Sequence, residues 1–163
     1  MVVMNTSNRG ADFIKQLQAD HPAYKFEPGE QDRWSARAST ITYNPGQSFK
    51  NLRYSVLHEL AHALLGHHSY QTDFELLKLE TKAWELAAEI GRKYKLRIND
   101  EHIQRCLDTY RDWLHGRSRC PNCSMQALQQ SASTYKCQNC SKTWRVSAGR
   151  FVRPYRQTVN KEQ

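Results

Sequence analysis

The sequence lacks the features that would place it in a membrane or mark it for export. No apolar run approaches the ~18 residues that a membrane-spanning helix needs. The first residues, 1–5, have neither the charged start nor the apolar core of a signal peptide. There is no internal repeat and no low-complexity tract. With 163 residues, the chain is therefore expected to form one compact domain with at most a small appendage, in the cytoplasm and without a membrane partner.

Cysteine is sparse, and its number is odd. The chain has five cysteines, and in a cytosolic protein these are more often metal ligands than disulfide partners. An odd number also means that at least one cysteine has another role.

Acidic residues are almost absent from the C-terminal third. Residues 117–163 hold nine of the 24 Lys and Arg residues but one of the 16 Asp and Glu residues, so the net charge of +8 originates there. A basic end on a nearly neutral body suggests an anionic partner, with nucleic acid as the first candidate. The alternative is a solvated basic tail that aids solubility.

Apolar spacing and turn residues predict an α+β fold that is mostly helical. Helices are expected over roughly 8–21, 50–66, 73–94 and 99–114, and a small sheet of two or three strands over 24–43. The helical pattern breaks near 115–118. We therefore expect a main domain over 1–115, a cysteine-bearing ribbon over 116–146 and a basic tail over 147–163.

The most specific motif is His58-Glu59-Leu60-Ala61-His62, inside the expected second helix. Residues four apart share a helix face, so the imidazoles of His58 and His62 can reach one cation. Glu59 is then placed to act as general base towards water at a zinc ion. Random placement would give this pattern about 0.02 times in a chain of this composition. Two buried histidines without a shared partner would also be costly in so apolar a helix.

A catalytic zinc site needs a third protein ligand. The candidates nearby in the sequence are His67, His68, Glu75, Glu80, Glu85 and Glu89. Glu80 is the best placed, because Ala83 and Ala87 on the same helix allow a close approach to the His58–His62 helix. His68 is the alternative third ligand, and His67 is expected to be a polar residue that suits the helix C-terminus.

These residues carry a family resemblance. The stretch from Leu57 to His67, followed by Glu80-Thr81-Lys82-Ala83 and Ala87, resembles the ImmA/IrrE family of metallo-endopeptidases. The resemblance covers roughly residues 33–90 and implies a zincin-like peptidase domain. It implies His58, His62 and Glu80 as zinc ligands and Glu59 as catalytic base. It also implies cleavage of a regulatory or DNA-bound protein.

The C-terminus departs from that family and supports a rival. SprT-like and Spartan-type peptidases combine an HExxH helix with a C-terminal zinc ribbon and act on DNA-associated proteins. Trp34-Ser35 resembles the tryptophan-bearing strand of that group, and His68 would then take the place of its third histidine.

Four of the five cysteines form two C-x-x-C pairs separated by thirteen residues: Cys120, Cys123, Cys137 and Cys140. Each pair makes a knuckle that presents two thiolates, and two knuckles complete a tetrahedral zinc site. Four thiolates close the coordination sphere, so this zinc is expected to be structural. The small apolar core of the ribbon is expected to consist of Tyr135, Trp144 and Val146. The fifth cysteine, Cys106, is expected to be a buried core thiol on the helix before the ribbon.

Basic and aromatic residues alternate after the second knuckle, a pattern suited to single-stranded nucleic acid. The residues proposed to contact nucleic acid are Lys142, Trp144, Arg145, Arg150, Arg153 and Arg156.

The sequence thus predicts a zinc-dependent endopeptidase with one catalytic and one structural Zn²⁺, acting on a protein substrate. Two alternatives remain open. One is an SprT-like protease of DNA-bound proteins, and the other is a non-catalytic zinc-ribbon protein that binds nucleic acid.

Overall fold

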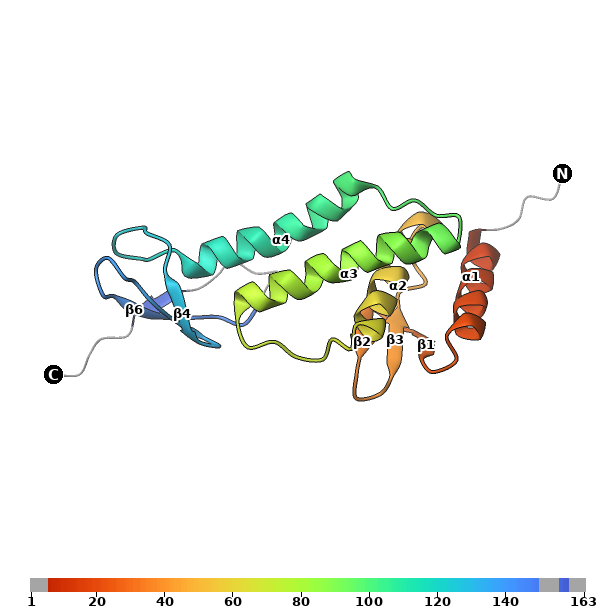
Figure 1. Ribbon diagram of the computed structural model, residues 1–163, viewed down its shortest axis with the longest axis horizontal. Helices are drawn as coiled ribbons and strands as arrows, with labels where there is room; N and C mark the ends of the chain where they lie inside the picture. Colours follow the sequence, from red (N-terminus) through yellow and green to blue (C-terminus); the bar gives the residue numbers. More distant parts are fainter. Residues whose placement is uncertain (1–5, 150–155, 159–163) are drawn as a thin grey trace. The chain divides into compact units, whose positions relative to one another are not determined.

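The computed structural model describes residues 6–149 and 156–158, and its α+β architecture confirms the expected fold class (Figure 1). Among these residues, no helix is both long and apolar enough to cross a membrane. The described elements are, in chain order, α1 (Thr6–Asp20), β1 (Lys25–Pro28), β2 (Arg33–Ser35), β3 (Thr40–Tyr43), α2 (Phe49–Leu64), α3 (Asp73–Lys93), α4 (Asp100–Ser118), β4 (Leu128–Ser131), β5 (Thr134–Lys136), β6 (Thr143–Val146) and β7 (Arg156–Thr158).

The chain divides into two compact units. The first holds the described residues up to Ser69 together with Thr81–Asn99, and the second holds Tyr70–Glu80 together with the described residues from Asp100 onward. The division passes through α3 between Glu80 and Thr81, although α3 is one continuous helix.

The first unit packs helices on a three-stranded sheet with strand order β1-β3-β2. Strand β3 pairs in parallel with β1 and antiparallel with β2, so β2 is an edge strand. Helices α1 and α2 contact each other, and α2 packs on β2 and β3 (Figure 1). The apolar side chains that the sequence places at helical spacing, notably Leu17, Leu57 and Leu60, are fully buried and form the core together with Ile41 of β3.

Helix α2 has clear start and stop signals. The side chain of Ser48 accepts a hydrogen bond from the backbone N–H of Asn51 and caps the first turn. The helix stops before Gly66, whose φ of +67° is a left-handed conformation that glycine adopts without steric cost. The chain can therefore turn sharply after the His58–His62 segment.

Helices α3 and α4 begin with favourable residues as well. Thr72 accepts a hydrogen bond from the N–H of Glu75 at the start of α3, and acidic residues occupy the first turn of each helix. Helix α4 continues to Ser118, one turn beyond the expected end at Leu114. The added turn contains Arg117, which is buried.

The second unit contains a four-stranded antiparallel sheet with strand order β4-β5-β6-β7. Tyr135 on β5 pairs with Trp144 on β6, and their rings stack with centroids 5.8 Å apart. These two side chains and Val146 form one buried cluster with Cys120 and Cys137. The small apolar core predicted from the sequence is therefore confirmed.

Candidate metal centres

Two groups of metal-ligating side chains are present among the described residues, and the first lies on α2 and α3. His58 and His62 are one helical turn apart on α2, and their Nε2 atoms are 3.1 Å apart. A tetrahedral zinc ion with Zn–N bonds of about 2.0–2.1 Å holds two nitrogen ligands about 3.3 Å apart. The separation of the two imidazoles therefore fits a shared cation.

Glu80 on α3 provides the third ligand atom of this group. A carboxylate oxygen of Glu80 and one ring nitrogen each from His58 and His62 all lie within 4.8 Å of one another. His58 and Glu80 are both buried, at 7% exposure. Ala83 and Ala87 are fully buried, as expected if α3 approaches closely along this side. Two imidazoles and one carboxylate are a donor set found in catalytic zinc sites.

An aromatic side chain that sequence reasoning did not single out supports the first histidine. The indole of Trp84 on α3 stacks on the ring of His58, with centroids 4.1 Å apart and an interplanar angle of 23°. The stacked indole restricts rotation of the His58 ring. Trp84 lies one turn after Glu80, and that spacing is the signal in the sequence that would have found it.

Glu59 is held from the edge strand β2. Its Oε2 accepts a hydrogen bond of 2.7 Å from the backbone N–H of Trp34. The indole Nε1 of Trp34 donates to the carbonyl oxygen of His67 at 2.8 Å. Trp34 therefore fixes both the carboxylate after the first histidine and the turn that follows α2. The side chain of Glu59 is half-buried.

The two histidines after Gly66 have different surroundings. The Nδ1 atom of His67 is 2.9 Å from Nδ1 of His62, so its ring contacts a residue of the metal group. His68 is exposed, and its Nδ1 is 3.0 Å from the carbonyl oxygen of Gly66. The structure therefore groups Glu80, and not His68, with the two helix histidines. Sequence reasoning missed the contact between His67 and His62.

The second group consists of the four ribbon cysteines, whose Sγ atoms all lie within 4.8 Å of one another. The Sγ atoms of Cys120 and Cys140 are 3.6 Å apart, and those of Cys123 and Cys137 are 3.5 Å apart. A tetrahedral site with Zn–S bonds of about 2.3 Å places sulfur atoms about 3.8 Å apart. The four thiols are therefore spaced to hold one zinc-sized ion.

The two knuckles repeat the same backbone turn. The N–H of Ser124 donates to the carbonyl of Cys120, and the N–H of Ser141 donates to that of Cys137. Both serines have a positive φ, 62° and 59°. Each cysteine pair is therefore presented by the same kind of backbone turn.

Hydrogen bonds lower the pKa values of two of the four thiols. The backbone N–H of Met125 and the side chain of Asn139 lower the pKa of Cys123 to about 6. The side chain of Asn122 and the backbone of Lys142 lower the pKa of Cys140.

Cys137 behaves differently. Its pKa is lowered by the backbone N–H of Cys140 but is raised more by burial and by the thiols of Cys123 and Cys140, and the result is about 11. Four neighbouring thiolates repel one another, and a divalent cation relieves that repulsion.

A buried ion pair contacts the ribbon core. Oδ2 of Asp73, at the start of α3, accepts hydrogen bonds from Nε of Arg117 at 2.7 Å and from the hydroxyl of Tyr135 at 2.5 Å. Both charged side chains are 3% exposed. Burial and the hydrogen bond to Asp73 raise the pKa of Tyr135, which keeps its proton on the hydroxyl.

The same network extends over the sheet. The guanidinium of Arg117 also donates to the carbonyls of Ser147 and Ala132, and Nε1 of Trp144 donates to the carbonyl of Arg117. These contacts join β6 and the turn between β4 and β5 to α4. Arg117 is one of the basic residues of the C-terminal third, but it is buried and its charge is paired with that of Asp73.

The residues predicted to contact nucleic acid differ in their exposure to solvent. Trp144 is fully buried and has no exposed ring to stack on a base, so its assignment as a nucleic-acid contact is corrected to a core role. Arg145 is exposed, and Lys142 is half-buried. Arg156 donates to the carbonyl of Arg119 at 2.6 Å. Arg150 and Arg153 lie outside the described residues.

Cys106 is half-buried, not buried as expected. Its Sγ lies 3.6 Å from Nε2 of His102 on the preceding turn of α4.

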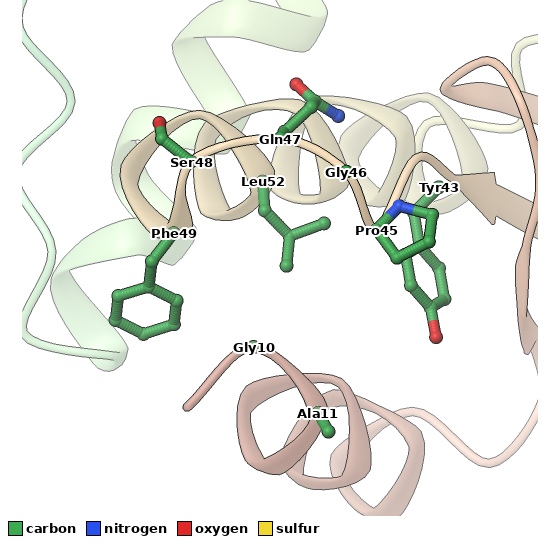
Figure 2. A pocket seen from close by; sticks show the side chains of 9 residues that line it. All are labelled: Gly10, Ala11, Tyr43, Pro45, Gly46, Gln47, Ser48, Phe49 and Leu52. Atoms are coloured by element: carbon green, nitrogen blue, oxygen red, sulfur yellow. The ribbon is translucent and has the colours of Figure 1, made fainter. Parts of the chain in front are cut away.

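A pocket of about 590 Å³ lies at the N-terminal end of α2 (Figure 2). Leu52 projects into it between Tyr43 and Phe49, opposite the backbone of Gly10 and Ala11 on α1. None of the residues of either metal group lines this pocket.

Comparisons with known proteins give no match: no family model, no curated protein and no solved structure is found to be similar to this chain. The two groups of ligating side chains are therefore the features of this chain that indicate a function.

Proposed function

We propose that this chain is a zinc-dependent endopeptidase. The observation that carries the proposal is the group formed by His58, His62 and Glu80, because its three ligand atoms lie within 4.8 Å of one another. Glu59, which directly follows the first histidine, supplies the carboxylate that peptide hydrolysis requires. A zinc ion bound by these three residues would polarise the scissile carbonyl and make water a nucleophile near neutral pH.

The side chains of the protein have separate roles in the proposed reaction. Glu59 accepts a proton from the attacking water and passes it to the leaving amine nitrogen. The amide of Trp34 restrains one oxygen of that carboxylate. Trp84 keeps the ring of His58 in place by stacking on it. The base and the metal ligands are therefore held before a substrate arrives, which lowers the cost of reaching the reactive geometry.

The resemblance to the ImmA/IrrE peptidases agrees with this proposal. That resemblance assigns the three ligand roles to His58, His62 and Glu80, the residues that are grouped here. The ribbon cysteines would hold a second, structural zinc. By the same resemblance, the substrate class is a regulatory or DNA-associated protein in the cytoplasm.

The test of catalysis is the variant Glu59→Gln, with Glu89→Gln as the matched control. Glu89 is exposed on α3 and is not part of either metal group. The probe is a library of quenched fluorescent peptides, and cleaved bonds are identified by mass spectrometry. We expect the wild type and Glu89→Gln to cleave, and Glu59→Gln to keep both metals but lose at least a hundredfold in rate, the scale of lost general base catalysis.

Two outcomes would reject the peptidase proposal. One is that the zinc-loaded wild type cleaves no library peptide and no protein bound to DNA. The other is that Glu59→Gln cleaves as fast as Glu89→Gln.

A second candidate function is binding of nucleic acid by the ribbon, either to bring an SprT-like protease to DNA-bound proteins or as the sole activity. The favouring observation is that Lys136 on β5 and Arg145 on β6 are both exposed. Their neighbours Tyr135 and Trp144 are buried, so alternation along the strands places both cations on the outward face of the sheet.

Salt dependence tests this second function. Each phosphate contact to single-stranded DNA contributes about −0.7 to the slope of log K against log salt. The double variant Lys136→Gln with Arg145→Gln should therefore reduce the slope by about 1.4 if both cations contact phosphates. An unchanged slope, or no binding to oligonucleotides by the wild type, would contradict this role of the ribbon.

A further inference from the structure

His67 is held in place by its backbone on both sides. The chain reverses at Gly66, and the N–H of His67 then donates to the carbonyl of His62 at 3.0 Å. Its own carbonyl accepts from the indole N–H of Trp34 at 2.8 Å. These two hydrogen bonds fix the backbone of His67 on both sides of its Cα atom. They therefore restrict the directions in which its ring can point.

The ring of His67 contacts one particular nitrogen of His62. The two Nδ1 atoms are 2.9 Å apart, and the ring centroids are 5.0 Å apart. The other nitrogen of His62, Nε2, is the one that lies 3.1 Å from Nε2 of His58. His62 therefore offers one ring nitrogen to the metal group and the other to His67.

A metal bound at Nε2 of His62 would determine the position of the protons. A ring nitrogen that binds a metal carries no proton, so in a neutral ligand the proton must be on the other nitrogen. With Nε2 of His62 on the metal, Nδ1 would carry the proton and would donate a hydrogen bond to His67. Nδ1 of His67 would then be the acceptor, and the proton of His67 would be on its Nε2.

We propose that His67 is a positioning residue of the His58–His62–Glu80 metal centre. By accepting a hydrogen bond from Nδ1–H of His62, it fixes the tautomer and the ring orientation of that ligand. In most metal sites this partner is a carboxylate, a backbone carbonyl or water, and its loss typically weakens metal binding 10- to 100-fold. The inference rests on the proposed metal site, but it does not require peptidase activity.

The adjacent histidine excludes a simpler explanation. If the polar end of α2 required only imidazoles near the last carbonyls, His67 and His68 would have similar surroundings. Instead, His68 is exposed and its Nδ1 lies near the carbonyl of Gly66, while His67 contacts the ring of His62. His68 is therefore the matched control for His67.

The test measures metal affinity in the full chain with the ribbon loaded. Co²⁺ is titrated against a competing chelator, and its visible absorption reports the coordination geometry. We expect His67→Phe to weaken binding 10- to 100-fold and His68→Phe to leave it within twofold. We also expect the Nδ1 proton of His62 to become undetectable by NMR in His67→Phe.

Conservative variants separate hydrogen bonding from packing. The amide oxygen of Asn reaches the position of Nδ1, whereas that of Gln reaches the position of Nε2. His67→Asn should therefore recover most of the affinity, and His67→Gln should not. This comparison between two polar variants also holds if His67→Phe fails to fold.

Different results would reject the different proposals. If His67→Phe binds Co²⁺ as tightly as wild type, or if Asn and Gln behave alike, the positioning role is wrong although the metal site stands. If wild type itself binds no metal that is lost in His58→Ala, the metal site is wrong. If His67→Phe also changes the Co²⁺ coordination number, His67 is a ligand and not a positioning residue.

Discussion

The buried pair of Asp73 and Arg117 provides a quantitative prediction for the stability of the second unit. Replacing Arg117 by Met keeps most of the side-chain length but leaves the carboxylate of Asp73 with the Tyr135 hydroxyl as its remaining partner in this network. Because both charged groups are 3% exposed, water cannot replace the lost cation at low cost. Removing one partner of such a pair typically costs about 3–5 kcal/mol.

Smaller losses add to this value. The Arg117 guanidinium lies 4.5 Å from the centre of the Trp113 ring, and such a contact contributes about 0.5–1 kcal/mol or more when desolvated. The carbonyls of Ser147 and Ala132 also lose a donor, but both residues have access to water, so we assign them little. We therefore expect Arg117→Met to lower the free energy of unfolding by about 4 kcal/mol, dominated by the unpaired charge.

Two control variants distinguish the buried charge from other effects. Arg111 pairs with Asp108 at the same distance, 2.7 Å, but the two side chains are 43% and 60% exposed. Arg111→Met should therefore cost at most about 1 kcal/mol. The double variant Asp73→Asn with Arg117→Met removes both charges and should cost less than Arg117→Met alone.

The assay is urea unfolding of the full chain, followed by the amide NMR signals of β5 and β6. Free zinc is buffered at one concentration, because a bound metal adds to the apparent stability of the folded state. The reasoning is refuted if Arg117→Met costs no more than Arg111→Met, or if the double variant is less stable than the single one.

Three further predictions follow from other features. Purified protein should hold two zinc ions per chain, of which Cys137→Ser removes one and His58→Ala the other, as measured by elemental analysis; a single metal lost in both variants would contradict two separate sites. Gly66→Ala should lower the midpoint of thermal unfolding, because alanine at a φ of +67° costs about 1–2 kcal/mol; an unchanged midpoint would show that the turn relaxes. Burial and the charge of Lys93 lower the pKa of His21, although Asp20 opposes them. The contribution of His21 to the free energy of unfolding is therefore complete above pH 6.5 and is lost as the pH falls below that value. His21→Gln should flatten the dependence of stability on pH in that range, and an equal slope in both proteins would argue against this role of His21.

Local spacing in the sequence predicts those structural features that depend on residues close together in the chain. The stop of α2 at Gly66, the pairing of His58 with His62 and the two cysteine knuckles follow from separations of a few residues, and all three are found. The ribbon core was also predictable, because so short a segment has few large apolar side chains to bury.

Contacts between distant residues were not predictable in the same way. Trp34 lies 25 residues before Glu59, and Asp73 lies 44 residues before Arg117. No local pattern indicates that the amide of Trp34 binds the Glu59 carboxylate, or that one of many arginines in a basic segment is buried. These contacts arise only when the fold brings the segments together.

The shared carboxylate oxygen of Asp73 limits how the C-terminal region can be exchanged or removed. A chain cut after residue 115 would lose Arg117 and Tyr135 together, and would leave the first turn of α3 with a carboxylate that has lost both donors. Any replacement C-terminal module must therefore bring its own cation and hydroxyl, or be accompanied by a change at position 73. For the same reason, loss of activity on deletion of the ribbon would not show that the ribbon binds a substrate, and substitutions on its exposed face are the cleaner test.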